Sequence, residues 1–272
     1  MTKRFIILID FSEYSSNLIK YACDWSKQVK AEILLIHQTT VLAPALTDNE
    51  SRQHIAQLAN DEALQKLKSL AKELIPNTFM VSYSVSESHL QFVLQKFLAE
   101  PFENLIFVGL KGTGLLKKIF LGSVALRVID NTNNTVVAMP KEIDTFSHKK
   151  IFVAVTEKHP FSILELNNFL KFIDNQNTNI TFFYLAKPNE KTIGIAKQLR
   201  ELSEMFADRF DTDFAIFEGH NSFDDIKKVI SNKTDEMLIV QKGSRHLTDQ
   251  FFRKFLINDL IYEGRTPLII LP

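Results

Sequence analysis

Cysteine is nearly absent from this sequence: Cys23 is the single cysteine among 272 residues. One cysteine can form neither an intramolecular disulfide nor a CxxC site, so we expect a protein of the reducing cytoplasm. The chain also enters an apolar run at Phe5 without the long apolar core of a signal peptide, which favours the same location. Cys23 lies beside apolar positions of a helical pattern, which predicts packing rather than thiol chemistry.

Long hydrophobic runs and an excess of charge are missing as well. The longest apolar runs, such as 5–9 and 268–271, are far shorter than the ~20 residues that cross a bilayer, so no membrane span is predicted. The 32 Lys plus Arg balance 32 Asp plus Glu. Without a basic surplus we expect no general nucleic-acid binding. The seven histidines show no HExxH or paired spacing, so the sequence assigns no metal site.

Apolar residues, by contrast, are plentiful. They make up 45% of the chain and include 23 Phe, most of which sit inside apolar runs. Such Phe residues are predicted to pack in a core rather than to stack against nucleic-acid bases. At roughly 150 residues per domain, the length predicts about two domains, each large enough to bury a core.

Short apolar runs alternate with helical patterns, which is typical of βαβ units around a parallel sheet. In the first half the expected strands are 5–9, 32–38, 79–85, 104–108 and 135–139, with helices near 18–29, 55–74, 89–99 and 122–130. A polar segment, 141–149, has no apolar period and is predicted to be a linker. Beyond it the pattern repeats, with strands 151–155, 180–185, 214–217, 237–240 and 268–271 and helices 193–206 and 223–230. We therefore predict two copies of one five-stranded unit, in domains 1–141 and 150–272.

The strongest chemical signal follows the expected strand 104–108. Gly109, Gly112 and Gly122, the last followed by Ser123, read as G, two residues, G, nine residues, G-S. Glycine after a parallel strand lets the backbone approach a ligand, and amides at the start of the next helix attract phosphate. The pattern fits neither a Walker A loop nor the dinucleotide fingerprint. The alternative is that these glycines only make a turn and a helix cap.

This pattern resembles the universal stress protein family, whose nucleotide-binding members carry G-2x-G-9x-G-[ST] after the fourth strand. Residues 10–16 and 34–37 resemble the family's first loop and second strand, and residues 122–140 resemble its ending. The resemblance covers residues 1 to about 141 and, more weakly, the remainder as a second copy. It implies an α/β fold with two tandem five-stranded parallel sheets flanked by helices, of the adenine nucleotide alpha hydrolase type. The implied strand order is 3-2-1-4-5, with a dimerising last strand.

The resemblance also implies that the first half binds ATP, with or without Mg²⁺. Asp10 would contact the adenosine portion, and the backbone near Gln38 would lie beside the base. The remaining implied contacts are Gly109 and Gly112 for the ribose and phosphates, and Gly122, Ser123 and Val124 for the phosphate chain. For Asp10 the sequence leaves a second role open, because an Asp before a helix can cap its free amides.

The second copy lacks the corresponding residues. Thr156 stands where Asp10 stands in the first half, and Gln241 stands in the place of Gly109. Aligning 120–123 with 255–258 puts Ile and Asn in place of the Gly-Ser pair, and a branched side chain there obstructs close backbone approach. We therefore expect one nucleotide site per chain.

Three functions are compatible with these observations. The first is an ATP-binding universal stress protein that senses or signals in a stress response. The second is a dimeric interaction or scaffold module of the same fold without nucleotide binding. The third is an ATP-using enzyme of a related fold, although no nucleophile or general base is recognisable. The sequence assigns no catalytic residue and leaves slow ATP hydrolysis open.

The last strands suggest how the two halves associate. Strands 135–139 and 268–271 are apolar and would be exposed edges if each half stood alone. An exposed edge strand invites uncontrolled pairing. We expect the halves to form an intramolecular pseudo-dimer through these strands, and a homodimer of whole chains is a further possible assembly.

Overall fold

The structure is a computed structural model, and it describes residues 1–41, 48–110, 123–141, 143–157, 160–174, 176–186, 189–218, 236–242 and 266–272. The first half contains β1 (Thr2–Leu8), α1 (Glu13–Val29), β2 (Glu32–Gln38), α2 (Asn49–Leu74), β3 (Val81–Ser86), α3 (Leu90–Leu98), β4 (Phe102–Gly109), α4 (Ser123–Asn131) and β5 (Val136–Met139). The second contains β6 (Lys150–Ala154), α5 (Ile163–Leu170), β7 (Asn179–Ala186), α6 (Ile193–Phe206), β8 (Asp211–Glu218), β9 (Glu236–Gln241) and β10 (Leu268–Leu271).

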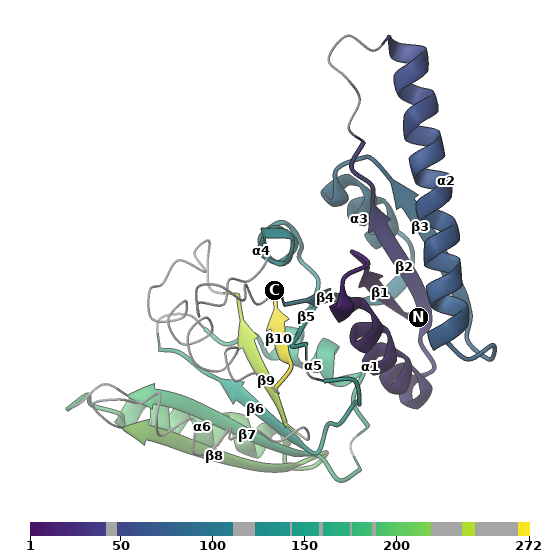
Figure 1. Cartoon of the computed structure of the whole chain (residues 1–272). Helices are drawn as coiled ribbons and strands as arrows, with labels where there is room; N and C mark the ends of the chain where they lie inside the picture. The colour runs from purple at the N-terminus through teal and green to yellow at the C-terminus, as the bar shows by residue number, and fades with distance from the viewer. Residues whose placement is uncertain are drawn as a thin grey trace.

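All ten strands form one sheet, in the order β3-β2-β1-β4-β5-β10-β9-β6-β7-β8 (Figure 1). Each half has the order that the family resemblance implies, and its strands are parallel. The α/β prediction is confirmed. The two five-stranded units are joined edge to edge into a single sheet, because β5 and β10, the last strands of the two halves, pair antiparallel.

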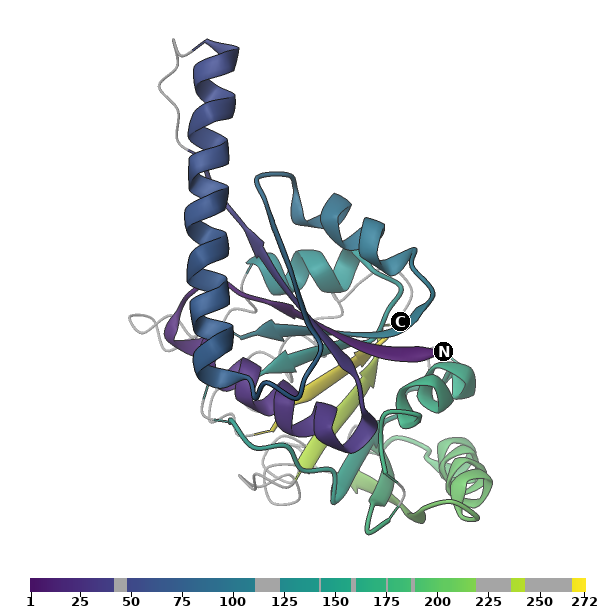
Figure 2. The same cartoon turned by 90° about the vertical axis from the view of Figure 1, so that its right-hand side faces the viewer.

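Strand residues alternate between the two faces of the sheet and build two apolar layers. Phe5 and Ile7 face the layer that contains residues of α1, α2, α5 and α6, whereas Ile6 packs in the other layer with residues of α3 and α4. Both layers contain residues of both halves, so the core is continuous across the β5–β10 junction. Figure 2 shows α2 standing beside the sheet and extending beyond it.

Local sequence explains where the helices of the first half begin and end. Asp48 caps α2 by accepting a hydrogen bond from the Ser51 amide at 2.9 Å. Pro76 follows shortly after the helix, where its ring prevents continuation. In α1 the last turn closes on Lys30, whose φ of 55° is the left-handed conformation common at helix ends.

The expected elements agree with the structure to within a few residues at most positions. Strands 32–38 and 268–271 have the predicted bounds, and helix 193–206 is α6. Helix α5 was not predicted, and α2 begins six residues before the expected residue 55. The expected helix 223–230 lies outside the described residues.

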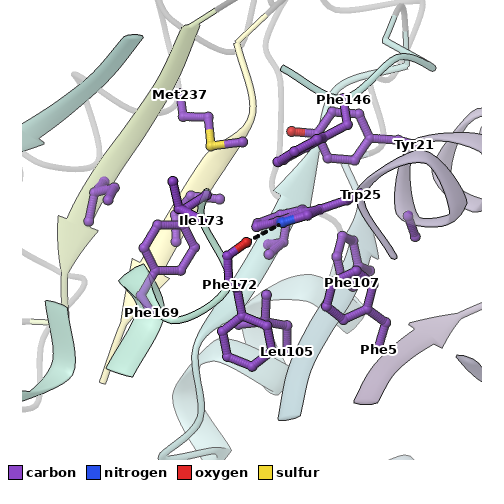
Figure 3. Packing of buried hydrophobic residues seen from close by; sticks show 14 of the residues in the cluster. Phe5, Tyr21, Trp25, Leu105, Phe107, Phe146, Phe169, Phe172, Ile173 and Met237 are labelled. Carbon is purple, nitrogen blue, oxygen red and sulfur yellow. Dashed lines mark hydrogen bonds between the residues drawn. The ribbon is translucent and has the colours of Figure 1, made fainter. Parts of the chain in front are cut away.

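The predicted linker, 141–149, has no helix or strand in its described residues, but part of it packs in the core, which the sequence analysis did not expect. Ile143 and Phe146 of this segment are buried, at 2% and 5% exposure. The Phe146 ring stacks on Trp25 of α1 with centroids 4.4 Å apart and an interplanar angle of 14° (Figure 3). Ile143 and Phe146 are therefore part of the core, but two apolar residues were too few to form a periodic pattern.

Candidate nucleotide site

Three of the expected site residues lie at one edge of the sheet. Gln38 ends β2, Asp10 follows β1 and Gly109 ends β4, and these three strands are adjacent in the order β2-β1-β4. Because the strands are parallel, their carboxyl ends meet at the same edge, where open α/β sheets bind ligands. The structure therefore brings these residues to a common location.

The remaining expected residues belong to the loop before α4 and to the start of that helix. Ser123 is the first residue of α4, and Val124 has 42% of its surface exposed. Gly112 and Gly122 lie outside the described residues, as do Ile257 and Asn258 of the second half. The phosphate hypothesis needs donors at this helix start, and the first amides of any helix lack partners within the helix itself.

Asp10 organises the turn between β1 and α1. Its Oδ1 accepts hydrogen bonds from the Ser12 amide at 3.0 Å, from Ser12 Oγ at 2.6 Å and from Ser15 Oγ at 3.2 Å. The residue at the N-cap position is Ser12, which has no side-chain capping bond. Asp10 thus lies two residues before the N-cap position and fixes the path of the chain there, so its carboxylate is held at the sheet edge.

An aromatic pair that the sequence analysis did not single out lies beside Asp10. Phe11 has a φ of 57° and is 36% exposed, and its ring centroid is 4.4 Å from that of His37 at the end of β2. His37 Nδ1 lies 2.7 Å from the carbonyl oxygen of Ile9, which fixes the orientation of the imidazole ring. This arrangement has no recognisable sequence signal, because a left-handed Phe is uncommon.

Gly109 leaves room next to the first turn of α1. Within the described residues, a Cβ added at Gly109 would meet only Cβ of Tyr14, at 3.6 Å, which is an ordinary van der Waals distance. Lys141 lies over the Tyr14 ring, 5.5 Å from its centroid, and pairs with Glu13 at 2.5 Å. The edge of the sheet around Gly109 is thus bordered by aromatic and charged side chains of α1 and of the segment after β5.

The second half fills the equivalent position. Gly109 pairs with Met139 at the end of β5, and Gln241 pairs with Leu271 at the end of β10, so Gln241 is the counterpart of Gly109. Gln241 Oε1 accepts a hydrogen bond from the Ser162 amide at 2.7 Å, and its Nε2 lies 3.4 Å from the Pro160 carbonyl oxygen. This side chain bridges across the loop that follows β6.

The loops after β1 and β6 support the same comparison. The Ile9 amide donates to Ile36 O at 2.8 Å, and the Val155 amide donates to Phe183 O at 2.9 Å. Ile9 and Val155 are therefore equivalent, and so are the residues that follow them, Asp10 and Thr156. The alignment of the two halves predicts the same correspondence. A threonine supplies a neutral hydroxyl where the first half has a carboxylate, so the two edges differ in charge.

A separate groove of about 300 Å³ lies between α3 and α4, lined by residues such as Phe92, Leu94 and Val128. Asp10, Gln38, Gly109 and Val124 are not among the residues that line it. Among the described residues, no group of three or more His, Cys, Asp or Glu side chains is placed to hold a metal ion. The helices described here include none with the length and apolar content needed to cross a membrane.

A doubly wound α/β unit, present in two copies, defines the class of this protein. The sequence model of the Universal stress protein family matches residues 1–140. The chain belongs to the universal stress protein family. A universal stress protein of Methanocaldococcus jannaschii is 30% identical over 145 residues, which cover 51% of this chain and 82% of that relative.

Solved structures extend the likeness in fold to both halves. The crystal structure of a universal stress protein from Archaeoglobus fulgidus has a TM-score of 0.71 at 17% identity, and the match covers 100% of this chain and 99% of that one. A putative universal stress protein from Pseudomonas aeruginosa has a TM-score of 0.54 at 14% identity, covering 99% and 93% of the two chains. The cytoplasmic domain of a prokaryotic cation chloride cotransporter has a TM-score of 0.56 at 11% identity, covering 99% and 95%. At these identities the structures show a shared fold and nothing more.

Proposed function

We propose that the first half binds one adenine nucleotide, ATP, at the carboxyl ends of β1, β2 and β4, and that the chain uses it in stress-response sensing or signalling. Membership of the family supports the class of function. The spacing of Gly109, Gly112 and Gly122 before Ser123 supports a nucleotide as the ligand. The buried Cys23, at 4% exposure, is compatible with our further proposal of a cytoplasmic location.

One observation carries the proposal: the end of the fourth strand bears no side chain in the first half and a hydrogen-bonded side chain in the second. In the first half Gly109 keeps the end of β4 free of a side chain, and Asp10 is held nearby by Ser12 and Ser15. In the second, Gln241 spans the equivalent space. If this edge of the sheet served packing alone, a side chain such as Gln241 would suit both halves. The glycine at position 109 is explained if a ligand needs the space.

The test exchanges the residue types at positions 109 and 241 between the two halves. We expect calorimetry to count one ATP per chain, and Gly109→Gln to weaken ATP binding at least about tenfold, because the added side chain occupies the approach to β4. The matched control is Gln241→Gly, which removes the equivalent side chain from the second half and should leave ATP affinity unchanged. Circular dichroism checks that both variants keep the fold.

Three results would contradict the proposal. A stoichiometry near two would mean that the second half also binds. Unchanged affinity in a folded Gly109→Gln variant would remove β4 from the site. The absence of any bound nucleotide, tested by calorimetry and by mass spectrometry of the purified protein, would favour the interaction or scaffold function.

A further inference from the structure

Lys242 reaches from the second half to the end of a helix in the first. It follows Gln241, the last residue of β9, and its amide donates to Leu271 O at 2.8 Å, which fixes its backbone to the sheet. Its Nζ lies 2.8 Å from the carbonyl oxygens of both Ile129 and Asp130, and 3.4 Å from that of Thr132. These carbonyls belong to the last turn of α4 and the residue just beyond it.

The chemistry of this contact favours a fixed helix. The last four carbonyls of an α-helix have no partner within it, and the carbonyl end carries a partial negative charge. An ammonium group donates up to three hydrogen bonds, so Lys242 both satisfies these carbonyls and compensates their charge. Since Val128 and Ile129 of α4 are also buried in the core, the helix is held along its side and at its carboxyl end.

The opposite end of α4 is the proposed phosphate end of the nucleotide site. The helix runs from Ser123 to Asn131, which is about 14 Å at 1.5 Å per residue. Because α4 is short and has no proline or glycine to bend it, we expect it to shift as one body. A residue that fixes its carboxyl end therefore also sets the position of the amides at Ser123 and Val124.

The first half makes a matching contact with the second. Lys3 Nζ donates to the carbonyl oxygen of Lys171, the C-cap residue of α5, at 2.6 Å. Trp25 Nε1 donates to the Phe172 carbonyl oxygen at 2.7 Å (Figure 3). Each half thus binds carbonyls at the end of a helix of the other. Only the Lys242 contact, however, involves the helix that begins at the phosphate end of the first-half site.

We propose that Lys242 is a positioning residue for the phosphate end of the nucleotide site in the first half. This inference rests on the proposed function. With this contact, the second half contributes to nucleotide binding in the first half although it binds no nucleotide itself. Gln241 bridges the loop after β6, while the next residue, Lys242, crosses to α4. At the end of β9, Gln241 thus occupies the space that corresponds to the site in the second half, and Lys242 supports the site in the first half.

The test separates phosphate binding from binding of the nucleoside. Affinities for ATP and for adenosine are measured by calorimetry for the wild type and for Lys242→Met, which keeps most of the side-chain length and removes the charge. We expect ATP to bind about fivefold more weakly or worse, with adenosine affinity unchanged, so that the ratio of the two affinities falls. Lys242→Arg restores a cationic donor and should recover most of that ratio.

Lys3→Met is the matched control, because Lys3 makes the same kind of contact at the same junction but does not bind α4. A purely structural role for Lys242 predicts that both methionine variants weaken ATP and adenosine by one common factor, and that result would overturn the inference. An unchanged ratio in Lys242→Met would overturn it as well. If the wild type binds neither ligand, it is the proposed function that fails, and the inference fails with it.

A second measurement needs no variant and covers the case in which Lys242→Met does not fold. Coupling between two sites is reciprocal, so bound ATP should strengthen the contact between α4 and Lys242. We expect ATP to slow hydrogen exchange in β9 of the wild type. Bound ATP with no change of exchange in β9 would count against the inference.

Discussion

At the scale of single residues, Tyr21 places a hydroxyl group inside the apolar core. Its side chain is 1% exposed among Trp25 and Phe146, and its hydroxyl has no hydrogen-bond partner within the described part of the chain. Burial, and to a lesser extent the charge of Asp24, raises the pKa of Tyr21 well above its usual value. We expect Tyr21→Phe to raise the free energy of unfolding by about 1–3 kcal/mol, because it removes an unsatisfied polar atom.

Urea unfolding measures this change, and Tyr184→Phe is the matched control. The Tyr184 hydroxyl donates to Glu190 Oε1 at 2.9 Å, so the same substitution removes a hydrogen bond there and should not stabilise the protein. A loss of stability in Tyr21→Phe would mean that the hydroxyl has a partner in solution, such as a buried water.

Cys23 should be chemically inert in the native protein. Burial raises the pKa of its thiol to about 11, and the charge of Lys27 only partly offsets this. Because the folded value lies above the unfolded one of about 8.5, the thiol favours folding below pH 8.5 and loses that contribution as pH rises toward 11. We expect a thiol reagent at pH 8 to label Cys23 only after unfolding. Rapid labelling of the native protein, followed by absorbance, would contradict this.

Residue chemistry could be predicted where it depends on residue type and spacing. Gly109 was identified because a glycine after a parallel strand is recognisable without coordinates, whereas the ligand role of Asp10 came from the resemblance to the universal stress protein family. Phe11 and His37 escaped notice because their contact depends on a left-handed backbone at a bulky residue. Lys242 escaped notice because its partners are backbone carbonyls more than 100 residues away.

At the scale of elements, the segment between the halves shows how packing outweighs pattern. Phe146 stacks on Trp25, and its amide donates to Asp24 Oδ2 at 3.2 Å. We expect Phe146→Ala to lower the free energy of unfolding by about 3–5 kcal/mol, as for other large core residues. The exposed neighbour gives the control: Thr145→Ala should stay within about 0.5 kcal/mol of the wild type. A similarly small effect at Phe146 would restore the linker interpretation.

The strands were easier to predict from the sequence than the short helices were. Buried runs such as that in β2 are apolar on both faces, which is a strong local signal. Helix α5 has only eight residues, and its buried Leu166, Phe169 and Leu170 do fall at helical spacing, a short signal that the prediction passed over. Which elements form depended on local pattern, and the apolar last strands indicated where the halves join, but the antiparallel register of β5 and β10 has no local signal.

At the scale of the whole molecule, the junction between β5 and β10 gives each half the strand partner that its apolar last strand needs. Val136, Val137 and Ala138 pair with Ile270, Ile269 and Leu268, and all six side chains are buried. In the intact chain this pairing leaves β3 and β8 as the edges of the sheet (Figure 1). Removing the second half would therefore expose an apolar edge at β5.

We expect residues 1–141, expressed alone, to form homodimers or to aggregate. An unpaired apolar strand is a template for pairing with another chain, and a second copy of β5 can replace β10 in the antiparallel arrangement. Light scattering gives the mass in solution, with the full-length chain measured under the same conditions for comparison. A stable and soluble monomer of residues 1–141 would show that β5 needs no partner, and the second half would then have to be retained for another reason, such as the support of α4 by Lys242.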